Sequence, residues 1–253
     1  RYLNPLMLYH NQYTNPLPGN NLMSYEIEYT PAPGWLTYVQ LAVDQWSSPL
    51  ETGSYTANEP NALGYLAGVR WQQPAGRGFV RTVAEAALMD PWVYIHNRGH
   101  TSLSYRDLLA AESFTTSNEP RGRAWIEEPL GYYTGNDSAV MFLESRYVEP
   151  GSWFAGLRAR AEVRGELDMT ATLPAGDEED LSRKENQATT PSGAHAEWTT
   201  FLTLFGELET PRSIGQVTLG GELTWATLTN AGNLDTPTEH DLQLVLYTRL
   251  IRP

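Results

Sequence analysis

The chain contains no cysteine in its 253 residues. This absence excludes a disulfide framework and thiolate metal sites, and it is typical of an oxidising compartment where stray thiols are avoided. Basic residues are also scarce, because 17 Lys and Arg stand against 30 Asp and Glu and leave a net charge of -13. Since phosphate binding needs a basic surface, this balance argues against nucleic acid as a partner.

Long hydrophobic runs are missing as well. No apolar stretch approaches the roughly 20 residues that a membrane-spanning helix needs. The chain starts at Arg1 without a methionine or a signal-like apolar core, which indicates a processed or truncated start. Its length suits one large all-β domain over residues 1–253. The 8 Trp and 14 Tyr suit either the aromatic girdles of a membrane barrel or a sugar-binding surface.

Strict alternation is the most informative feature that the chain does have. In the segment 154–169, FAGLRARAEVRGELDM, one parity is apolar and the other is dominated by Arg, Glu and Asp. Successive side chains of a strand point to opposite faces, so this segment predicts one apolar and one charged face. A helix in which Arg158 and Glu162 pair is the competing interpretation. The alternation and the internal Gly165 favour the strand.

Period-two patterns of this kind recur along the chain. Together with a first strand near Tyr2–Tyr9 they predict about ten strands, the others starting near Met23, Trp35, Leu63, Val80, Ala139, Phe154, Val217 and Leu242. The segment 198–208 is ambiguous, because Phe201 and Phe205 fall on its polar parity. A soluble sheet explains any single strand better, but agreement across seven or eight strands favours a membrane barrel with its apolar face toward lipid.

Short and long connections alternate between these segments. Tight turns are predicted at 30–34, 73–78, 149–152 and 210–213, each with a Pro that restricts the backbone for reversal. Long polar stretches lie at 47–61, 90–137, 170–195 and 230–237. Outer-membrane barrels have this arrangement, with the long loops outside the cell. The sequence therefore predicts an all-β fold, a transmembrane antiparallel up-and-down β-barrel of about ten strands, complete or part of a larger barrel.

Several strings resemble a known family. They are PLMLYHNQY (5–13), EYTPAPGWLTYVQLAVDQW (28–46) with PLE (49–51), PNALGYLAGV (60–69), DPWVYIH (90–96) and EPLGYYTGNDS (128–138). They resemble outer-membrane proteins similar to the Wzi capsule-assembly family, whose members are larger barrels with an N-terminal periplasmic portion. The chain is similar to the C-terminal part of such a protein or to a reduced version. It departs from the usual barrel ending, because its final LVLYTRLIRP lacks a terminal aromatic residue.

The resemblance implies a bacterial outer-membrane protein without enzymatic activity that attaches or organises surface polysaccharide (capsule). The implied partners are the lipid bilayer, surface polysaccharide and other envelope proteins, and no cofactor is implied. No local binding motif of the family can be transferred residue by residue. Two alternatives remain open, a porin for small polar solutes and a soluble all-β glycan-binding protein.

The charged parities would together line the interior of such a barrel. Their members are Glu26, Glu28, Asp44, Arg70, Arg81, Glu85, Glu144, Arg146, Arg158, Arg160, Glu162, Arg164, Glu166, Glu222, Asp241 and Arg249. Charges in the interior of a barrel must be hydrated or paired, because burying a lone charge is costly. Arginines and acids are nearly balanced, and about ten strands leave little open lumen. A plugged interior is therefore favoured over a pore with selective charge rings.

The stretch 90–137 is the predicted functional element, because a connection of this length is usually functional or disordered. Its aromatic side chains are candidates for stacking on sugar rings, namely Trp92, Tyr94, Trp125, Tyr132 and Tyr133. Its segment 106–114, RDLLAAESF, could form a short helix that folds into the mouth. The alternative is a cap that packs on itself and seals the barrel.

Motifs for catalysis or metal binding are weak. Glu26 and Glu28 meet a glycosidase's need for two carboxylates only trivially. His96 and His100 lie in a loop-like pattern without the spacing of metal ligands. The acidic run 177–180 has the oxygen ligands that calcium prefers, but it lacks the spaced glycine of a defined calcium loop. We therefore predict no active site, metal or cofactor.

Overall fold

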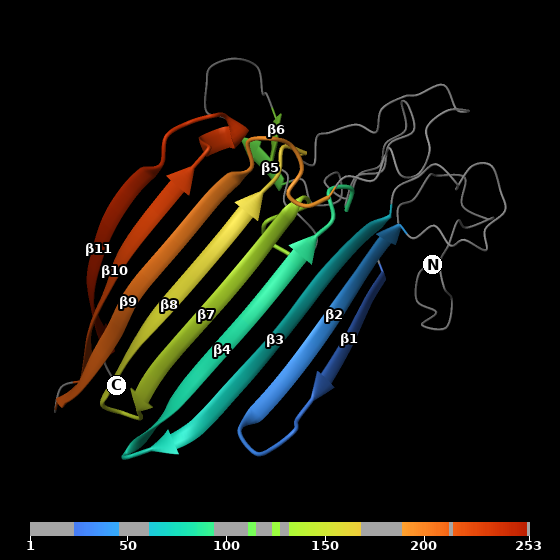
Figure 1. The fold of residues 1–253 in the computed structure, drawn as a ribbon. Helices are drawn as coiled ribbons and strands as arrows, with labels where there is room; N and C mark the ends of the chain where they lie inside the picture. Colours follow the sequence, from blue (N-terminus) through green and yellow to red (C-terminus); the bar gives the residue numbers. More distant parts are fainter. Residues whose placement is uncertain are drawn as a thin grey trace, which may run out of the picture.

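The computed structural model of the chain describes residues 23–45, 61–93, 111–114, 123–126, 132–167, 189–212 and 215–251. Nine antiparallel strands form one sheet in the order β1-β2-β3-β4-β7-β8-β9-β10-β11 (Figure 1). These strands are β1 (Met23–Tyr29), β2 (Trp35–Gln45), β3 (Ala62–Ala75), β4 (Gly78–Met89), β7 (Ser138–Glu149), β8 (Trp153–Arg164), β9 (Glu197–Arg212), β10 (Gly215–Thr229) and β11 (Glu239–Ile251). A separate pair, β5 (Ala111–Phe114) and β6 (Arg123–Ile126), belongs to the β4–β7 connection.

All short turns lie at one end of the sheet and all long connections at the other (Figure 1). Gly34, Gly76 and Gly151 take positive φ values of 81°, 59° and 71° in three of the turns. Glycine adopts this region without steric cost, so the Gly and Pro of these turns allow the tight reversals. A 3-10 turn, η2 (Ala231–Asn233), lies in the connection between β10 and β11.

The strand register brings the apolar parities of all nine strands onto one side of the sheet, which we call the apolar face. Leu157 of β8 pairs with Leu204 of β9, Leu204 pairs with Leu223 of β10, and Leu223 pairs with Leu244 of β11. The opposite side, which we call the charged face, carries most of the Arg and Glu residues. Because the side-chain period is two, a slip of one residue in any pairing would mix the two faces.

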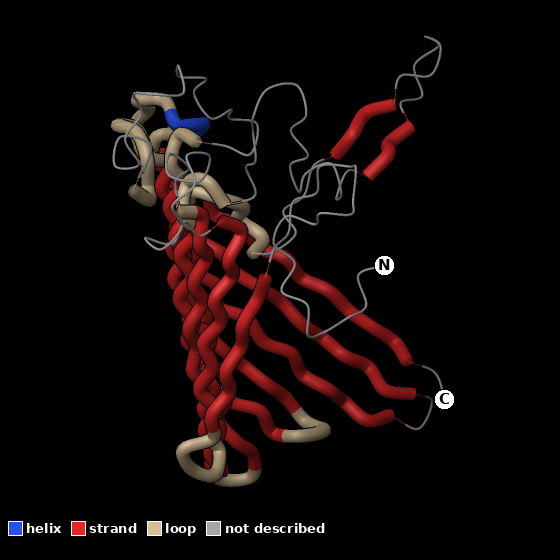
Figure 2. The backbone as a smooth tube through the Cα atoms, turned by 90° about the vertical axis from the view of Figure 1, so that its right-hand side faces the viewer, coloured by secondary structure: helices blue, strands red, loops and turns tan. Residues whose placement is uncertain are grey.

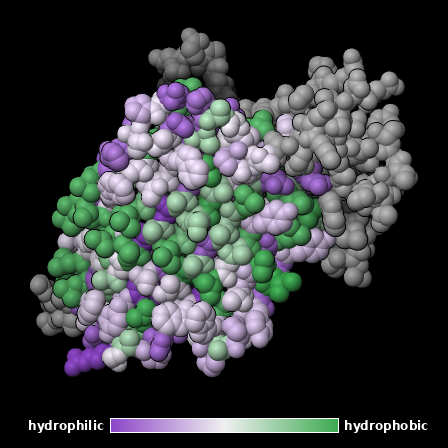
Figure 3. Space-filling view, in the orientation of Figure 1, coloured by the Kyte–Doolittle hydropathy of each residue, from purple (hydrophilic) through white to green (hydrophobic). Residues whose placement is uncertain are grey.

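The sheet is curved, as the side view in Figure 2 shows. In Figure 1, β10 and β11 turn behind the central strands. Figure 3 has the same orientation and shows the apolar face, where hydrophobic side chains form a band across the middle. The apolar face is therefore convex and the charged face is concave.

The all-β, antiparallel up-and-down arrangement predicted from the sequence is confirmed. In the described part of the chain the sheet is open, because β1 and β11 each pair on one side only. The predicted first strand near Tyr2–Tyr9 lies outside the described residues. Among the residues that are described, no helix is long and apolar enough to cross a membrane.

Two local predictions are wrong. The helix predicted for 106–114 is not formed over Ala111–Phe114, which is strand β5 and pairs with β6; the rest of that segment lies outside the described residues. Pairing with a distant partner outweighs the local helix propensity there. The second error concerns β8, which ends at Arg164 instead of Met169. The Gly165 amide leaves the strand ladder and donates to the Asp137 carbonyl at 2.8 Å.

Candidate functional site

A pocket of about 400 Å³ lies on the charged face. It is lined by Glu85, Tyr132, Tyr133, Phe142, Arg158, Arg160, Phe201, Thr203, Glu222 and Thr224. These side chains come from five neighbouring strands, β4, β7, β8, β9 and β10, and from the residues that precede β7. Tyr132 and Tyr133 line the pocket from the long connection before β7.

A buried cluster around Asp137 holds these two tyrosines in place. The Asp137 carboxylate accepts hydrogen bonds from the Leu167 amide at 3.1 Å, from the Ser192 amide at 2.9 Å and from the Ser192 hydroxyl. Asp137 itself has a φ of 48°, a value that Asp tolerates better than most residues. One carboxylate therefore joins the start of β7, the end of β8 and the segment before β9.

The same cluster includes the residues that follow β4. The Asn136 side-chain amide donates to the carbonyls of Pro91 at 2.6 Å and Leu167 at 3.0 Å. The Asp90 carboxylate accepts the Leu63 amide at 3.1 Å, while burial raises the pKa of this carboxyl above its usual value. We call residues 90–93, 134–138, 165–167 and 190–195 the connection cluster. It brings together the strings DPW and TGNDS, which are more than forty residues apart in the chain.

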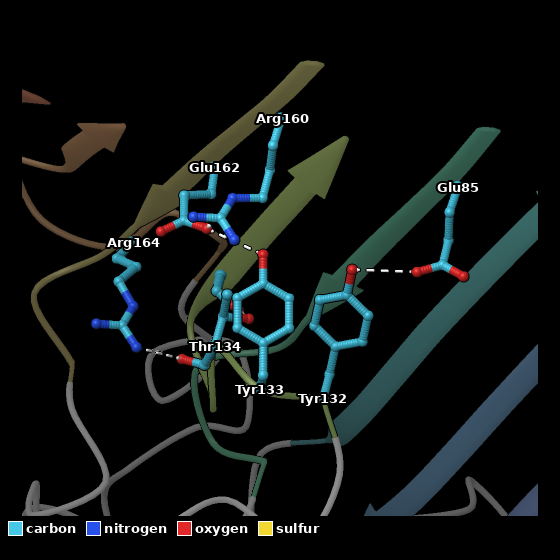
Figure 4. Close-up of polar contacts among 8 residues, drawn as sticks. Glu85, Tyr132, Tyr133, Thr134, Arg160, Glu162 and Arg164 are labelled. Carbon is cyan, nitrogen blue, oxygen red and sulfur yellow. Dashed lines mark hydrogen bonds and ion pairs between the residues drawn. The ribbon is translucent and has the colours of Figure 1, made fainter. Parts of the chain in front are cut away.

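Tyr132 and Tyr133 point from the connection cluster onto the charged face (Figure 4). The Tyr132 hydroxyl donates to Glu85 at 3.3 Å, and the Tyr133 hydroxyl donates to Glu162 at 3.0 Å. The two ring centroids lie 4.9 Å apart. Burial and the charge of Glu162 raise the pKa of Tyr133 to about 12, and burial and Glu85 raise the pKa of Tyr132. Both phenols are therefore hydrogen-bond donors at neutral pH.

Two arginines of β8 line one side of the pocket. Arg158 Nε donates to Glu144 at 2.9 Å, and its guanidinium lies 4.9 Å from the centroid of Phe205. The Arg160 guanidinium lies 4.1 Å from the centroid of Phe201. Each ring therefore supports a cation from the neighbouring strand. This explains why Phe201 and Phe205 occupy the polar parity that made β9 ambiguous in the sequence.

Hydrogen-bonding capacity remains available at both sides of the pocket. Arg160 contacts Glu162 at 3.5 Å, yet its Nε is buried and no described group accepts a hydrogen bond from it. A guanidinium carries five N–H donors, so Arg158 also retains donors beyond its bond to Glu144. On the other side, no described residue donates a hydrogen bond to the Glu222 carboxylate.

Three glycines of the charged face lie beneath aromatic rings from neighbouring strands. The pairs are Gly68 with Tyr38, Gly156 with Phe205 and Gly220 with Tyr247, each directly opposite in the register. A Cβ at any of these glycines would collide with the ring. Aromatic residues opposite glycines help to set the register of a curved sheet. The charged face is thus packed by specific pairs.

The register places the predicted interior charges on the charged face with two exceptions. Glu166 lies beyond the end of β8, where its carboxylate accepts the amides of Ala194 and His195, both at 2.8 Å. Its predicted place on an interior wall is wrong, because the chain bends at Gly165. Asp44 sits at a register shift of β2, so the strand pattern does not assign its face.

The predicted sugar-stacking residues are only partly brought together. Tyr132 and Tyr133 line the pocket. Trp92 does not offer a ring face, because it is 6% exposed within the connection cluster, and that assignment is corrected. Tyr94 lies outside the described residues, and Trp125 belongs to β6, of which only the backbone is described.

Sequence reasoning missed four of the lining residues, Phe142, Phe201, Thr203 and Thr224. They are uncharged residues on the charged parity of their strands. Phe and Thr on that parity of β7, β9 and β10 are the signal that could have revealed the pocket. In the part of the chain that the structure describes, no three His, Asp or Glu residues gather as metal ligands. His96, His100 and residues 177–180 lie outside that part.

Comparisons with family models, with curated proteins and with solved structures found no match. Function must therefore be inferred from the two faces of the sheet and from the pocket.

Proposed function

We propose that the chain forms the wall of a non-enzymatic outer-membrane β-barrel with a role in surface-polysaccharide assembly or attachment. One observation carries this proposal. Apart from Tyr133, Leu234 and Val245, every exposed large hydrophobic side chain among the described residues lies on the apolar face. Met141 is 70% exposed and Leu246 is 75% exposed. Soluble proteins rarely expose a contiguous apolar patch beyond a few hundred Å², so lipid is the occupant that we assign to this face.

Aromatic side chains border the apolar face at both ends. They are Tyr29, Trp35, Trp71, Tyr147 and Trp153 near the short turns, and Tyr25, Tyr65, Trp198 and Trp225 near the long connections. On β8, Trp153 and Val163, the partner of Trp198, are ten residues apart. That spacing is roughly 33 Å along a strand, or about 23 Å of membrane thickness at a 45° tilt. Membrane barrels have an apolar band of this height between aromatic girdles.

Strand length and stagger also suit a membrane barrel. Every strand of the main sheet except β1 has 11 to 16 residues, and a tilted strand needs about 9–11 to cross a bilayer. Following the register across the sheet, the last residue of β1, Tyr29, shares a row with Leu242, near the start of β11. Barrel closure requires such a stagger. In lipid the free edges of β1 and β11 must also be paired.

The polysaccharide role takes its support from the pocket and from the family resemblance. Tyr132 and Tyr133 offer aromatic surfaces with polar edges, which suit contact with sugar rings. Around them, guanidinium and carboxylate groups supply donors and acceptors for hydroxyl groups. The pocket also lies toward the end of the long connections, which in outer-membrane barrels faces the cell exterior.

A porin for small polar solutes is the second candidate, and the charged, concave face favours it. Conductance in a planar lipid bilayer separates the two roles. A stable open channel would support the porin, and its absence together with glycan binding would support polysaccharide handling.

Single-cysteine variants test the membrane assignment directly, because the chain has no cysteine of its own. Leu202→Cys and Leu204→Cys lie on the apolar face of β9, and Thr203→Cys lies between them on the charged face. In lipid vesicles, fluorophores at the first two positions should be quenched by nitroxide-labelled acyl chains, and a fluorophore at the third should not. Equal quenching at all three positions, or a monodisperse protein in buffer without any amphiphile, would contradict the proposal.

Glycan binding tests the pocket. Tyr133→Ala should lose binding on a glycan array, because it removes a ring and a hydroxyl from the pocket wall. Tyr29→Ala, on the apolar face, is the matched control and should bind as the unmodified protein does. Unchanged binding by Tyr133→Ala would show that sugar binds elsewhere.

A further inference from the structure

The charges of the charged face are sorted by strand. β3, β4, β7 and β8 carry Arg70, Arg81, Arg146, Arg158, Arg160 and Arg164 against Glu85, Glu144 and Glu162. β9, β10 and β11 carry Glu197, Glu207, Glu209, Glu222, Glu239 and Asp241 against Arg249 alone. The face therefore has a basic centre and an acidic flank. β1 adds two further acids at the opposite edge, Glu26 and Glu28.

The curvature of the sheet brings the acidic flank opposite the basic centre. Because the charged face is concave, the strands of the acidic flank turn toward the basic centre instead of lying beside it in a plane (Figure 2). A space lined by one sign on one wall and the opposite sign on the other has a field across it, and low-dielectric walls strengthen that field. A ligand with both charges can align with such a field.

The pocket lies on the boundary between the basic centre and the acidic flank. Arg158 and Arg160 of β8 line one side, and Glu222 of β10 lines the other. Between them, the hydroxyls of Thr203 and Thr224 are hydrogen-bonded to each other at 3.0 Å. Strands two positions apart are separated by about 10 Å, and the side chains shorten the gap between the charged groups.

We propose that this pocket binds a small zwitterion whose anionic group meets Arg158 and Arg160 and whose cationic group meets Glu222. The proposal rests on the proposed function only in requiring that the charged face is hydrated and reachable. A ligand with a single charge would leave one charged wall desolvated and unmatched. The shared chemistry is an ammonium and an acid group about 5–8 Å apart, either in a free amino-acid-like solute or in a saccharide unit with a free amine and a carboxylate.

Calorimetric titration of the full chain in detergent tests this inference with two sets of probes. The solute arm compares 6-aminohexanoate with hexanoate and hexylamine. The saccharide arm compares a disaccharide of glucosamine and glucuronate with its N-acetylated form, which lacks the positive charge. In at least one arm the zwitterion should bind about tenfold more tightly than each singly charged analogue, the factor expected for one net charge-assisted hydrogen bond. The arm that shows this preference identifies the source of the ligand.

Charge-removing variants then assign the two ends of the ligand. Glu222→Gln should abolish the preference over the anionic analogue, and Arg160→Gln should weaken the preference over the cationic analogue. Arg160→Lys keeps the charge and should retain most of the preference, which separates loss of charge from loss of folding. Glu26→Gln removes the same charge on the same face outside the pocket and should leave binding unchanged.

Equal affinities for zwitterions and singly charged analogues in both arms would overturn the inference. A preference that survives Glu222→Gln would overturn it as well. Neither result touches the membrane assignment, which the quenching of β9 variants tests independently. Loss of lipid quenching with a preserved zwitterion preference would instead reject the membrane wall and leave the pocket assignment standing.

Discussion

The two faces of the main sheet are built from the same nine strands and are organised differently. On the apolar face many large side chains are exposed, and neighbours such as Leu157, Leu204 and Leu223 are the same residue. On the charged face several positions have a specific partner, such as Arg158 with Glu144 or Gly156 with Phe205. One face thus needs only the right hydropathy, whereas the other needs particular residues.

The largest difference between the faces should appear when the same charge is introduced on each. Leu244→Arg places a guanidinium on the apolar face of β11, and Gln243→Arg places one on the charged face one residue away. In a bilayer the first should lower the free energy of unfolding by about 2–4 kcal/mol, because arginine is costly at lipid-facing positions near the midplane. The second should change it little. Denaturant titration in lipid vesicles compares them, and equal losses would contradict the assignment of lipid to one face.

The next effect should come from the connection cluster, which lies next to the two tyrosines of the charged face. Asp137→Ala leaves the amides of Leu167 and Ser192 without their acceptor, so we expect a loss of about 2–3 kcal/mol in local stability. Hydrogen exchange should speed up at these two amides and remain slow at Leu204 in the middle of β9. Asp137→Asn keeps one acceptor oxygen and should lose less. Uniformly faster exchange across the sheet would mean that the cluster supports the whole fold.

Replacing one glycine on each face by alanine compares how tightly the two faces are packed. At Gly156, on the charged face, a Cβ would meet the Phe205 ring at 2.6 Å and the Arg146 Cβ at 2.8 Å. At Gly206, on the apolar face, the shortest approach would be 3.0 Å, to the Phe154 carbonyl oxygen. Gly156→Ala should therefore lower the free energy of unfolding by about 1–2 kcal/mol, the usual range for overpacking. Thermal unfolding should show a clearly smaller change for Gly206→Ala, and the reverse order would contradict this account.

The smallest expected effect concerns Tyr133, whose hydroxyl donates to Glu162 on the charged face. Tyr133 has a pKa of about 12 in the fold against a usual value of 10.0. Its protonated hydroxyl therefore contributes stability below pH 10, and this contribution is lost as the pH rises toward 12. At neutral pH, Tyr133→Phe should lower the free energy of unfolding by about 1 kcal/mol, the usual contribution of one hydrogen bond.

Absorbance at 295 nm during an alkaline titration checks the same group. The unmodified protein should show a tyrosine that ionises near pH 12 and that Tyr133→Phe lacks. Glu162→Gln should shift that ionisation toward pH 10, because the charge of Glu162 contributes to the raised pKa of Tyr133. Identical titrations in all three proteins would show that Tyr133 does not contact Glu162.

Much of the fold could be predicted from local pattern. The alternation in β8 and the Pro and Gly of the turns report steric preferences of a few adjacent residues, so strands and reversals were accessible. The errors arise where distant segments meet. Ala111–Phe114 pairs with β6, Gly165 is drawn to Asp137, and Trp92 is buried by the connection cluster. The pattern of a few adjacent residues does not reveal any of these contacts.

The candidate site shows the same limit. Arg158, Arg160, Glu85 and Glu222 were assigned to the charged face from parity, and the up-and-down order was predicted as well, but neither fixes the register that brings these side chains to one pocket. The near balance of arginines and acids suggested a neutral interior. The observed order and register show that the charges are sorted into a basic centre and an acidic flank, with the pocket at their boundary.

By itself the sequence determined two-sided strands, because successive side chains of an extended backbone must point in opposite directions. It also determined where the chain can reverse, because Pro and Gly restrict or widen the backbone angles locally. Register and curvature decided every feature that depends on contact between two distant residues. These features are the single continuous apolar face, the hydrogen bonds by which Asp137 joins three segments, and the pocket between Arg160 and Glu222. These outcomes required the tertiary structure, because the energies that select them come from contacts between residues far apart in the chain.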